Sequence, residues 1–256
     1  MTDPADILQR MYDQPRPLVF GHRGAMAYAP MNTLAAYELA AEQGADGVEL
    51  DVWLSQDDVP VIIHDFEVDK TTDGSGRVGS MSLEELKELD AGSWFDEQFA
   101  GERIPTLDEV FESVGQKLYI NVEIKSIDLK VQNVVAQTVE CIRRHGMQER
   151  VLVSCFNPMV LRQVRKQAPE LAMGFLRASD MPFYVSWLMF GVPHQAEHPH
   201  ETQVDANWVR KAHSRERKVN VWTVNDPDVA ARLQGLGVDG LITDKPDVIL
   251  EALDGR

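Results

Sequence analysis

The feature that most constrains the fold is the regular alternation of short apolar runs with longer amphipathic segments. The apolar runs have the length of strands, and the segments between them carry helical periodicity and helix caps. Repeated strand–helix units predict a parallel sheet covered by helices. The strands are expected at residues 18–22, 47–53, 118–125, 151–155, 172–176, 195–199, 219–224 and 239–243. Eight such units in 256 residues predict an α/β fold, a TIM (β/α)8 barrel, as a single domain over residues 1–256.

One stretch departs from this alternation directly after the second strand. In DVWLSQDDVPVIIHD, residues 51–65, two apolar runs are too close in sequence for a parallel crossover, which needs about a dozen residues. The stretch therefore predicts a hairpin with its turn near Asp57, in which position 64 folds back beside position 50. Residues 66–105 follow as a small insertion within the domain, with a short helix near 82–90.

Three carboxylates fall on two neighbouring strands, where active-site residues of a barrel gather. GVELDVW, residues 47–53, carries Glu49 and Asp51 on one face of its strand, and NVEIK, residues 121–125, carries Glu123. Three acids in a dry pocket stay ionised only where cations offset them. We favour one divalent cation, Mg²⁺ or Ca²⁺ with Mn²⁺ as a further candidate, because all-oxygen ligation suits these ions. The alternative is an ion network of the acids with Arg23 and Lys125.

Histidines and basic residues end strands in the same part of the predicted barrel. His22 ends the first strand and His64 ends the hairpin, and each imidazole can exchange a proton near neutral pH. Arg23 and Lys125 would bind a phosphate, the arginine as a planar fork and the lysine as a point charge. Trp222 would give a small polyol a flat apolar wall, or else simply fill the barrel.

The remaining histidines are expected to be surface or structural residues. The histidines in question are His145, His194, His198, His200 and His213. The motif EHPH, residues 197–200, resembles a metal-binding pair, but no third ligand lies nearby in the sequence. Cys141 and Cys155 are isolated thiols, which is typical of a reducing compartment.

Charge and hydropathy exclude several classes of partner. The net charge is −16, which argues against a nucleic-acid partner and against attraction to anionic lipid. The first 20 residues lack a long apolar segment, and no apolar run approaches the roughly 18 residues of a membrane span. We therefore expect a cytoplasmic protein with a small-molecule substrate. No sequence feature indicates an oligomeric state.

Several motifs, taken in order, resemble the glycerophosphodiester phosphodiesterase family. GHRGAMAYAPMNTLAAYELAAEQGADGVELDVWLSQDDVPVIIHD is followed by TTDGSG, IPTLDEV, NVEIK, VWTVN and GVDGLITDKP, so the similarity covers nearly the whole chain. The resemblance implies a TIM barrel that uses a divalent cation to hydrolyse glycerophosphodiesters to sn-glycerol 3-phosphate and an alcohol. It matches His22 and His64 to the acid–base pair, Glu49, Asp51 and Glu123 to the metal ligands, Arg23 and Lys125 to the phosphate-binding positions, and Trp222 to the glycerol pocket.

One position departs from the family pattern. Members usually read P-E-N-T where this chain has Pro30, Met31, Asn32 and Thr33. Methionine neither ligates a hard cation well nor forms a salt bridge. Because none of the inferred ligand positions is lost, we expect activity to remain, with weaker affinity if the usual glutamate fixes Arg23 or the metal shell.

The expected mechanism uses the histidines as acid and base. One removes a proton from the free glycerol hydroxyl next to the phosphate, whose oxygen attacks phosphorus to give a cyclic phosphate. The other protonates the leaving alcohol, and water then opens the ring.

Two alternatives to this function stay open. A lysophospholipase D acting on lysolipids would use a weak lipid contact through the apolar segment 182–192, although the simpler interpretation of that segment is the buried face of a barrel helix. A non-catalytic phosphodiester-binding barrel would need a missing catalytic group, and only Met31 is out of place.

Overall fold

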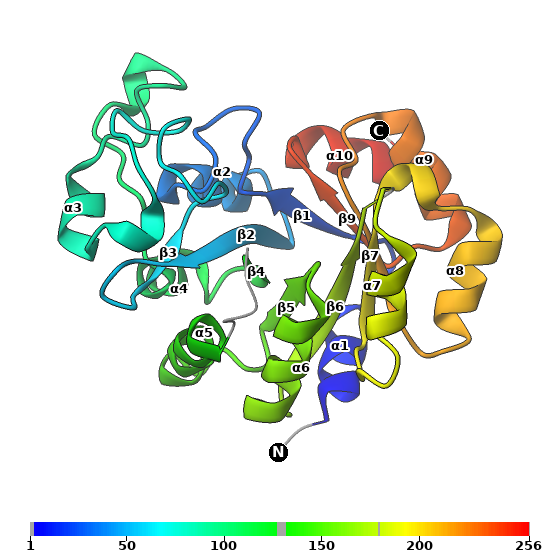
Figure 1. The fold of residues 1–256 in the computed structure, drawn as a ribbon. Coiled ribbons are helices and arrows are strands. Elements are labelled where there is room, and N and C mark those ends of the chain that lie inside the picture. Colours follow the sequence, from blue (N-terminus) through cyan, green and yellow to red (C-terminus); the bar gives the residue numbers. More distant parts are fainter. Residues whose placement is uncertain (1–2, 127–131, 179, 256) are drawn as a thin grey trace.

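The computed structural model describes residues 3–126, 132–178 and 180–255, and it has a closed barrel of parallel strands at its centre (Figure 1). The barrel strands are β1 (Leu18–His22), β2 (Gly47–Leu54), β4 (Tyr119–Ile124), β5 (Val151–Cys155), β6 (Ala172–Arg177), β7 (Ala196–Pro199), β8 (Lys218–Val221) and β9 (Gly240–Thr243). Neighbouring strands pair in parallel, and β1 pairs with both β2 and β9, which closes the ring. The predicted TIM barrel is confirmed, with half of the strand ends at the predicted residue and the others displaced by one to three residues.

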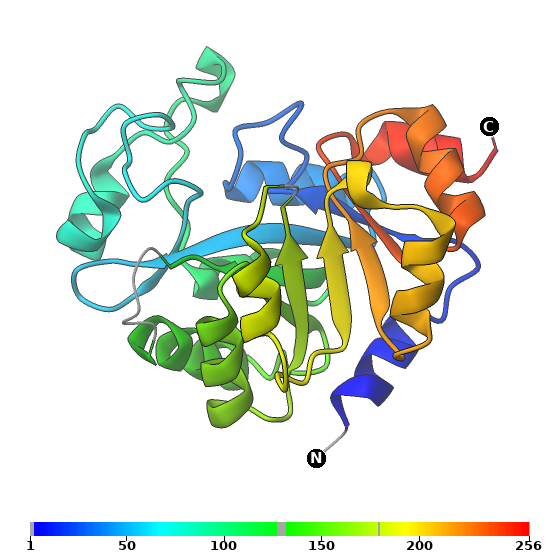
Figure 2. The same cartoon turned by 45° about the vertical axis from the view of Figure 1, so that its right-hand side comes forward.

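Helices follow the strands and lie on the outer side of the barrel (Figure 2). They are α2 (Leu34–Glu42), α4 (Leu107–Val114), α5 (Gln132–Arg144), α6 (Pro158–Gln167), α7 (Phe183–Leu188), α8 (Ala206–His213), α9 (Pro227–Leu236) and α10 (Pro246–Leu253), with a 3-10 turn, η3 (Glu201–Gln203), before α8. Side-chain caps fix where helices begin: Thr33 accepts a hydrogen bond from the backbone of Ala36, and Asn157 accepts one from Met159.

One end of the barrel is closed by a helix that the sequence pattern did not predict. In α1 (Pro4–Met11), Leu8 and Met11 belong to an apolar cluster with Leu18 and Phe20, at the N-terminal side of the barrel interior. Just after α1, the Tyr12 hydroxyl accepts a hydrogen bond from Asn220, 2.7 Å away. The open end is therefore the one where the strands have their carboxyl termini.

The predicted hairpin and insertion lie beside this open end. Strand β3 (Pro60–Ile62) pairs antiparallel with β2, with Val52 opposite Ile62, so the same register places position 64 opposite position 50 as predicted. The insertion contains η1 (Val78–Ser80), α3 (Leu83–Glu88) and η2 (Glu97–Phe99), and it projects from one side of the barrel (Figure 1). Val61, Val68, Val78 and Leu86 belong to a separate apolar cluster there.

The apolar segment 182–192 forms α7 and the turn that follows it. The side chains of residues 183, 184 and 186 lie outside the described part. Met189 and Val192 are buried, but Trp187 and Phe190 are 74% and 86% exposed. The interpretation as a wholly buried helix face is therefore wrong for these two aromatics. In the described part of the chain, no helix has the length and apolar character to cross a bilayer.

Candidate active site

A cavity of about 200 Å³ opens at the carboxyl end of the barrel strands. It is lined by His22, Arg23, Glu49, His64, Glu123, Lys125, Phe156, Leu176, Trp222 and Ile242. All the predicted site residues except Asp51 are in this lining. Asp51 lies beneath it, 1% exposed, in contact with Arg23 and Lys125. The structure therefore brings every residue singled out from the sequence into one place.

Strand register explains this convergence. In the parallel pair β1–β2, His22 lies beside Glu49, and in the pair β2–β4, Asp51 lies beside Glu123. Because side chains alternate along a strand, the acids spaced two apart point the same way, into the barrel mouth. His64 arrives from the hairpin that pairs with β2.

The three carboxylates share the mouth with two basic side chains. Each acid offers one oxygen that lies within 4.8 Å of the others. The ammonium of Lys125 lies 2.9 Å from Asp51 and 2.7 Å from Glu123, and the Arg23 Nε lies 3.2 Å from Asp51. The ion network considered from the sequence is thus present, and it engages two of the three acids.

Glu49 is the acid that this network leaves least compensated. Its carboxylate accepts the backbone N–H of Arg23 at 3.2 Å, and the His22 Nε2 lies 4.0 Å away. Burial and the charges of Asp51 and Glu123 raise the pKa of Glu49 well above its ordinary value. Burial also tends to raise the pKa of Asp51, but Lys125 and Arg23 outweigh it and hold that pKa below its ordinary value.

A divalent cation suits this imbalance. Among the described residues, three acids face two side-chain cations, and the surplus negative charge falls on a carboxylate that is 5% exposed. Burial of an uncompensated charge is costly. An all-oxygen donor set fits a hard ion such as Mg²⁺ or Ca²⁺. The donors therefore fit a hard cation without excluding the ion network, because Lys125 and Arg23 engage the same acids.

Two further residues position Asp51 from below. Asn32 donates to an Asp51 carboxylate oxygen at 2.8 Å, and Tyr37 donates its hydroxyl to Asn32 at 2.8 Å. Asn32 has φ of 59°, a left-handed conformation that asparagine tolerates better than most residues. No role in the site was assigned to Asn32 from the sequence, so this contact with Asp51 was missed.

Each histidine in the mouth is held by a carboxylate at its Nδ1. The distances are 2.7 Å from His22 to Asp244 and 2.8 Å from His64 to Asp65. Burial opposes ionisation of both carboxyls, but their hydrogen bonds and nearby cations outweigh it and lower the pKa of Asp244 and Asp65. An ionised carboxylate can only accept, so each Nδ1 carries the proton and Nε2 is left as the basic atom.

Burial also lowers the pKa of His64, which favours its neutral form. Asp244 was missed in the sequence, although it ends the last strand segment, GVDGLITD, where the strand-end rule could have found it.

An apolar wall completes the cavity on the side of Trp222. The indole ring meets Phe156 edge-on at 5.7 Å between ring centroids, and its N–H donates to the backbone of His198 at 2.8 Å. Leu176 and Ile242 continue this lining. Trp222 therefore both packs in the barrel and faces the cavity, so the two interpretations of this residue are compatible.

The other histidines have structural partners. His145 contacts Asp108, His194 contacts Glu197, and His213 contacts Asp239. His198 is buried inside the barrel next to Asn220, and His200 lies against Trp222. In the described part of the chain, no cluster of metal-ligating groups includes either histidine of the EHPH motif.

Met31 contacts the arginine of the mouth. The Met31 sulfur lies 3.4 Å from the Nη1 atom of Arg23. A thioether sulfur is a weak acceptor, so this hydrogen bond is weak. The exposed aromatics Trp187 and Phe190 precede β7 and so lie towards the N-terminal end of the strands. They are not part of the cavity lining.

The closed barrel, with a cavity lined by charged side chains and histidines at the carboxyl ends of its strands, is the architecture of a TIM-barrel enzyme. The model of the glycerophosphoryl diester phosphodiesterase family matches residues 22–248. The chain therefore belongs to this family of phosphoric diester hydrolases.

Relatives and solved structures agree with this assignment. A glycerophosphodiester phosphodiesterase of Caldanaerobacter subterraneus is 41% identical over 92% of this chain and 97% of its own. A phosphodiesterase of Oleispira antarctica, solved in complex with the product sn-glycerol-3-phosphate, superposes with a TM-score of 0.87 at 36% identity, covering 93% of this chain and 97% of that one. The glycerophosphodiester phosphodiesterase of Agrobacterium tumefaciens has a TM-score of 0.80 at 30% identity, and the match covers 91% of this chain and 98% of that one.

Proposed function

We propose that this chain hydrolyses glycerophosphodiesters to sn-glycerol 3-phosphate and an alcohol, with residues 1–256 acting as one catalytic domain into which 66–105 are inserted. The observation that carries the proposal is the composition of the cavity at the barrel mouth. It joins two carboxylate-held imidazoles, the basic side chains of Arg23 and Lys125, and the apolar wall of Trp222. The related Oleispira enzyme bound to sn-glycerol-3-phosphate supports the choice of substrate class.

Glu49, Asp51 and Glu123 would hold one divalent cation, and when bound this ion would polarise the phosphoryl group as a Lewis acid. The rest of the chemistry falls to this chain's own side chains. Arg23 and Lys125 bind the charged phosphate oxygens and orient the ester. Trp222 packs against the glycerol moiety and keeps water away from that side.

His22 and His64 act as the acid–base pair. The Nε2 of one histidine accepts the proton of the free glycerol hydroxyl, and the Nε2 of the other, protonated, donates to the departing alcohol. The new P–O bond closes a cyclic phosphate as the P–O bond to the alcohol breaks. Water then opens the ring with the two proton transfers reversed. Asp244 and Asp65 stabilise the imidazolium form of each ring in turn.

The test is release of sn-glycerol 3-phosphate from a panel of glycerophosphodiesters, with and without EDTA. The variants His22→Ala and His64→Ala should each lose about 10²–10⁴-fold in kcat. His213→Ala, far from the cavity lining, is the matched control and should keep normal turnover. If either mouth variant stayed within a few-fold of the wild type, the acid–base assignment would be wrong.

The cyclic route has its own test. A substrate analogue that lacks the free glycerol hydroxyl next to the phosphate has no internal nucleophile, so it should bind without being cleaved. Cleavage of this analogue at a normal rate would mean that water attacks phosphorus directly.

Lysolipid substrates remain the second candidate. The exposed aromatics Trp187 and Phe190 are not part of the cavity lining, so they offer an acyl chain no apolar surface there. We therefore expect glycerophosphocholine to be cleaved in preference to lysophosphatidylcholine, and the reverse preference would establish the lysophospholipase D alternative.

A further inference from the structure

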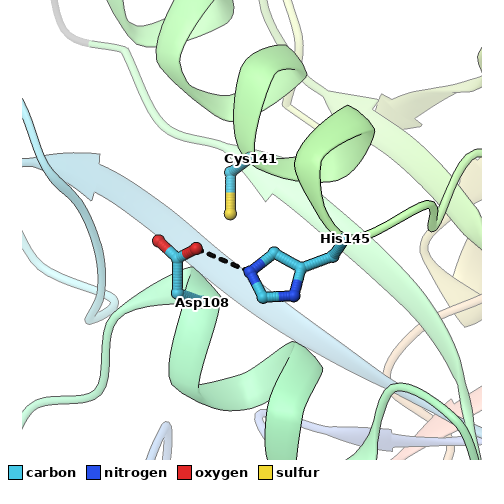
Figure 3. Close-up of side chains that lie close together, drawn as sticks. All are labelled: Asp108, Cys141 and His145. Carbon is cyan, nitrogen blue, oxygen red and sulfur yellow. Dashed lines mark hydrogen bonds and ion pairs between the residues drawn. The ribbon is translucent and has the colours of Figure 1, made fainter.

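A second group of metal-ligating side chains lies outside the barrel, between α4 and α5. It consists of Asp108 in the first turn of α4, Cys141 near the end of α5, and His145 directly after α5 (Figure 3). One donor atom from each lies within 4.8 Å of the others. None of these residues lines the mouth cavity, so the group is separate from the proposed active site.

The spacing of the two residues on α5 suits chelation. Cys141 and His145 are four residues apart, so their side chains lie on one face of the helix, and Figure 3 shows both directed towards Asp108. The His145 Nε2 already lies 2.6 Å from an Asp108 oxygen. The ring of His145 is steadied by Phe111, with 5.5 Å between ring centroids. Three ligands from two helices are therefore held close together before any ion binds.

The donor set differs from that of the mouth. It combines a sulfur, an imidazole nitrogen and a carboxylate oxygen, whereas the mouth offers oxygen alone. Sulfur and imidazole ligands select Zn²⁺ over Mg²⁺ or Ca²⁺, and Zn²⁺ readily takes three protein ligands and a water. The Cys141 side chain is fully buried, while those of His145 and Asp108 are 19% and 30% exposed, so an ion would have access from the outer side.

Arg144 is the group that competes with a cation here. Its guanidinium donates to both Asp108 oxygens, at 2.7 and 2.8 Å. This side chain is 52% exposed, and ion pairs at that exposure contribute little stability. Glu140, one helical turn earlier, already interacts with Arg144. The guanidinium of Arg144 could therefore pair with Glu140 once it is displaced from Asp108. The competing ion pair can therefore be exchanged at low cost.

We propose that Asp108, Cys141 and His145 form a Zn²⁺ site that cross-links α4 to α5. Binding exchanges the Cys141 S–H for a Zn–S bond and releases the proton to solvent. The thiolate and the carboxylate then neutralise the charge of the ion. Because the ligands come from two helices, an occupied site stabilises the folded chain, and above the dissociation constant this stabilisation rises with the logarithm of the free ion concentration.

Co²⁺ titration of the metal-stripped full chain tests this site through its sulfur. The wild type should show a sulfur-to-cobalt charge-transfer band that saturates as Co²⁺ is added and disappears when Zn²⁺ replaces it. The band should be lost in Cys141→Ser and weakened, with affinity lower by about tenfold or more, in His145→Gln. Cys155→Ser is the matched control and should keep the band, because that buried thiol donates instead to the backbone of Ile124.

Two further variants test whether the band is independent of the mouth and whether Arg144 competes with the ion. Glu49→Gln alters the mouth and should leave the band unchanged. Arg144→Gln removes the competing cation and should tighten Zn²⁺ binding several-fold. Absence of the band in the wild type, or its persistence in Cys141→Ser, would overturn the proposal. Should Cys141→Ser fail to fold, His145→Gln keeps the thiol, and an unchanged affinity in that variant would overturn it equally.

Discussion

Two buried ion clusters in this barrel differ in where their surplus charge resides. We define the mouth cluster as Arg23, Glu49, Asp51, Glu123 and Lys125. We define the wall cluster as Arg177, His194, Glu197 and Arg217. In the wall cluster one carboxylate receives Arg177 and Arg217, each at 2.6 Å, and His194 at 3.1 Å. In the mouth cluster three carboxylates share two cations.

The two clusters also differ in how well water can reach the surplus charge. In the wall cluster the surplus charge is positive and belongs to the guanidinium groups of Arg177 and Arg217. These side chains are 25% and 22% exposed, so water can solvate the charge. The surplus carboxyl of the mouth cluster is Glu49, which is 5% exposed and whose raised pKa reflects how poorly its ionised form is compensated. Water solvates an ionised Glu49 poorly, and this supports the proposal that the mouth binds a cation.

The largest expected effect follows from removing the surplus carboxylate. Glu49→Gln keeps the shape of the side chain but takes away one proposed metal ligand, so activity should fall by about 10³-fold, as EDTA should also cause. At the same time the metal-free variant should unfold at a temperature no lower than the metal-free wild type, because a buried uncompensated charge is gone. Product release and thermal unfolding in EDTA measure the two effects. A clear loss of stability in EDTA would show that Glu49 is compensated without any ion.

The same substitution in the wall cluster should have the opposite consequences. Glu197→Gln leaves two guanidinium groups without their shared carboxylate, and the free energy of unfolding should fall by about 2–3 kcal/mol, since breaking a buried pair costs several kcal/mol and the arginines can turn partly to solvent. Glycerophosphodiester turnover should stay within about twofold of the wild type. Urea unfolding at neutral pH gives the first value and the product assay the second. A large loss of turnover without a loss of stability would mean that the two clusters are not separable.

The pH dependence of this difference sharpens the comparison. Burial would raise the pKa of Glu197, but His194 and Arg177 outweigh it and lower that pKa to about 2, against 4.5 for an ordinary glutamate. A depressed pKa stabilises the fold above the unfolded value and loses that contribution as the pH falls towards the folded value. The stability gap between wild type and Glu197→Gln should therefore be about 1.4 kcal/mol smaller at pH 3.5 than at pH 6. Urea titrations at both pH values test this, and a gap that stays constant would contradict the depressed pKa.

Much of the mouth was predictable from the sequence because it depends on strand periodicity. Residues two apart point to the same face of any strand, so Glu49 and Asp51 share a face. The short connection around Asp57 sets the hairpin register that places His64 beside β2. The number of strand–helix units was enough to predict closure of the barrel. These features depend on residues that are near one another in the chain, so local sequence patterns are enough to predict them.

The contacts that the sequence did not reveal join residues far apart in the chain, which meet only when the barrel closes. Asp244 reaches His22 across 222 positions only because β9 pairs with β1. The wall cluster likewise joins residues from β6, β7 and the turn before β8, which have no shared local motif. Helix α1 was missed because it precedes the first strand and so falls outside the alternation that identified the other helices.

The smallest expected effect comes from Met31, the position where the mouth departs from the family pattern. Met31→Glu would place a carboxylate where Arg23 now meets a thioether sulfur at 3.4 Å, and so give the arginine a second charged partner, as in the wall cluster. A fixed guanidinium loses less freedom when the phosphate binds, which lowers KM.

The added negative charge opposes this by repelling the substrate, but residue 31 is outside the cavity lining, whereas Arg23 is part of it. We therefore expect a net fall in KM of about threefold, the scale of a partly exposed ion pair, with kcat unchanged. Met31→Gln, which adds no charge, is the control and should shift KM less. A rise in KM for Met31→Glu that Met31→Gln does not share would show that the surplus negative charge of the mouth, rather than the freedom of Arg23, limits substrate affinity.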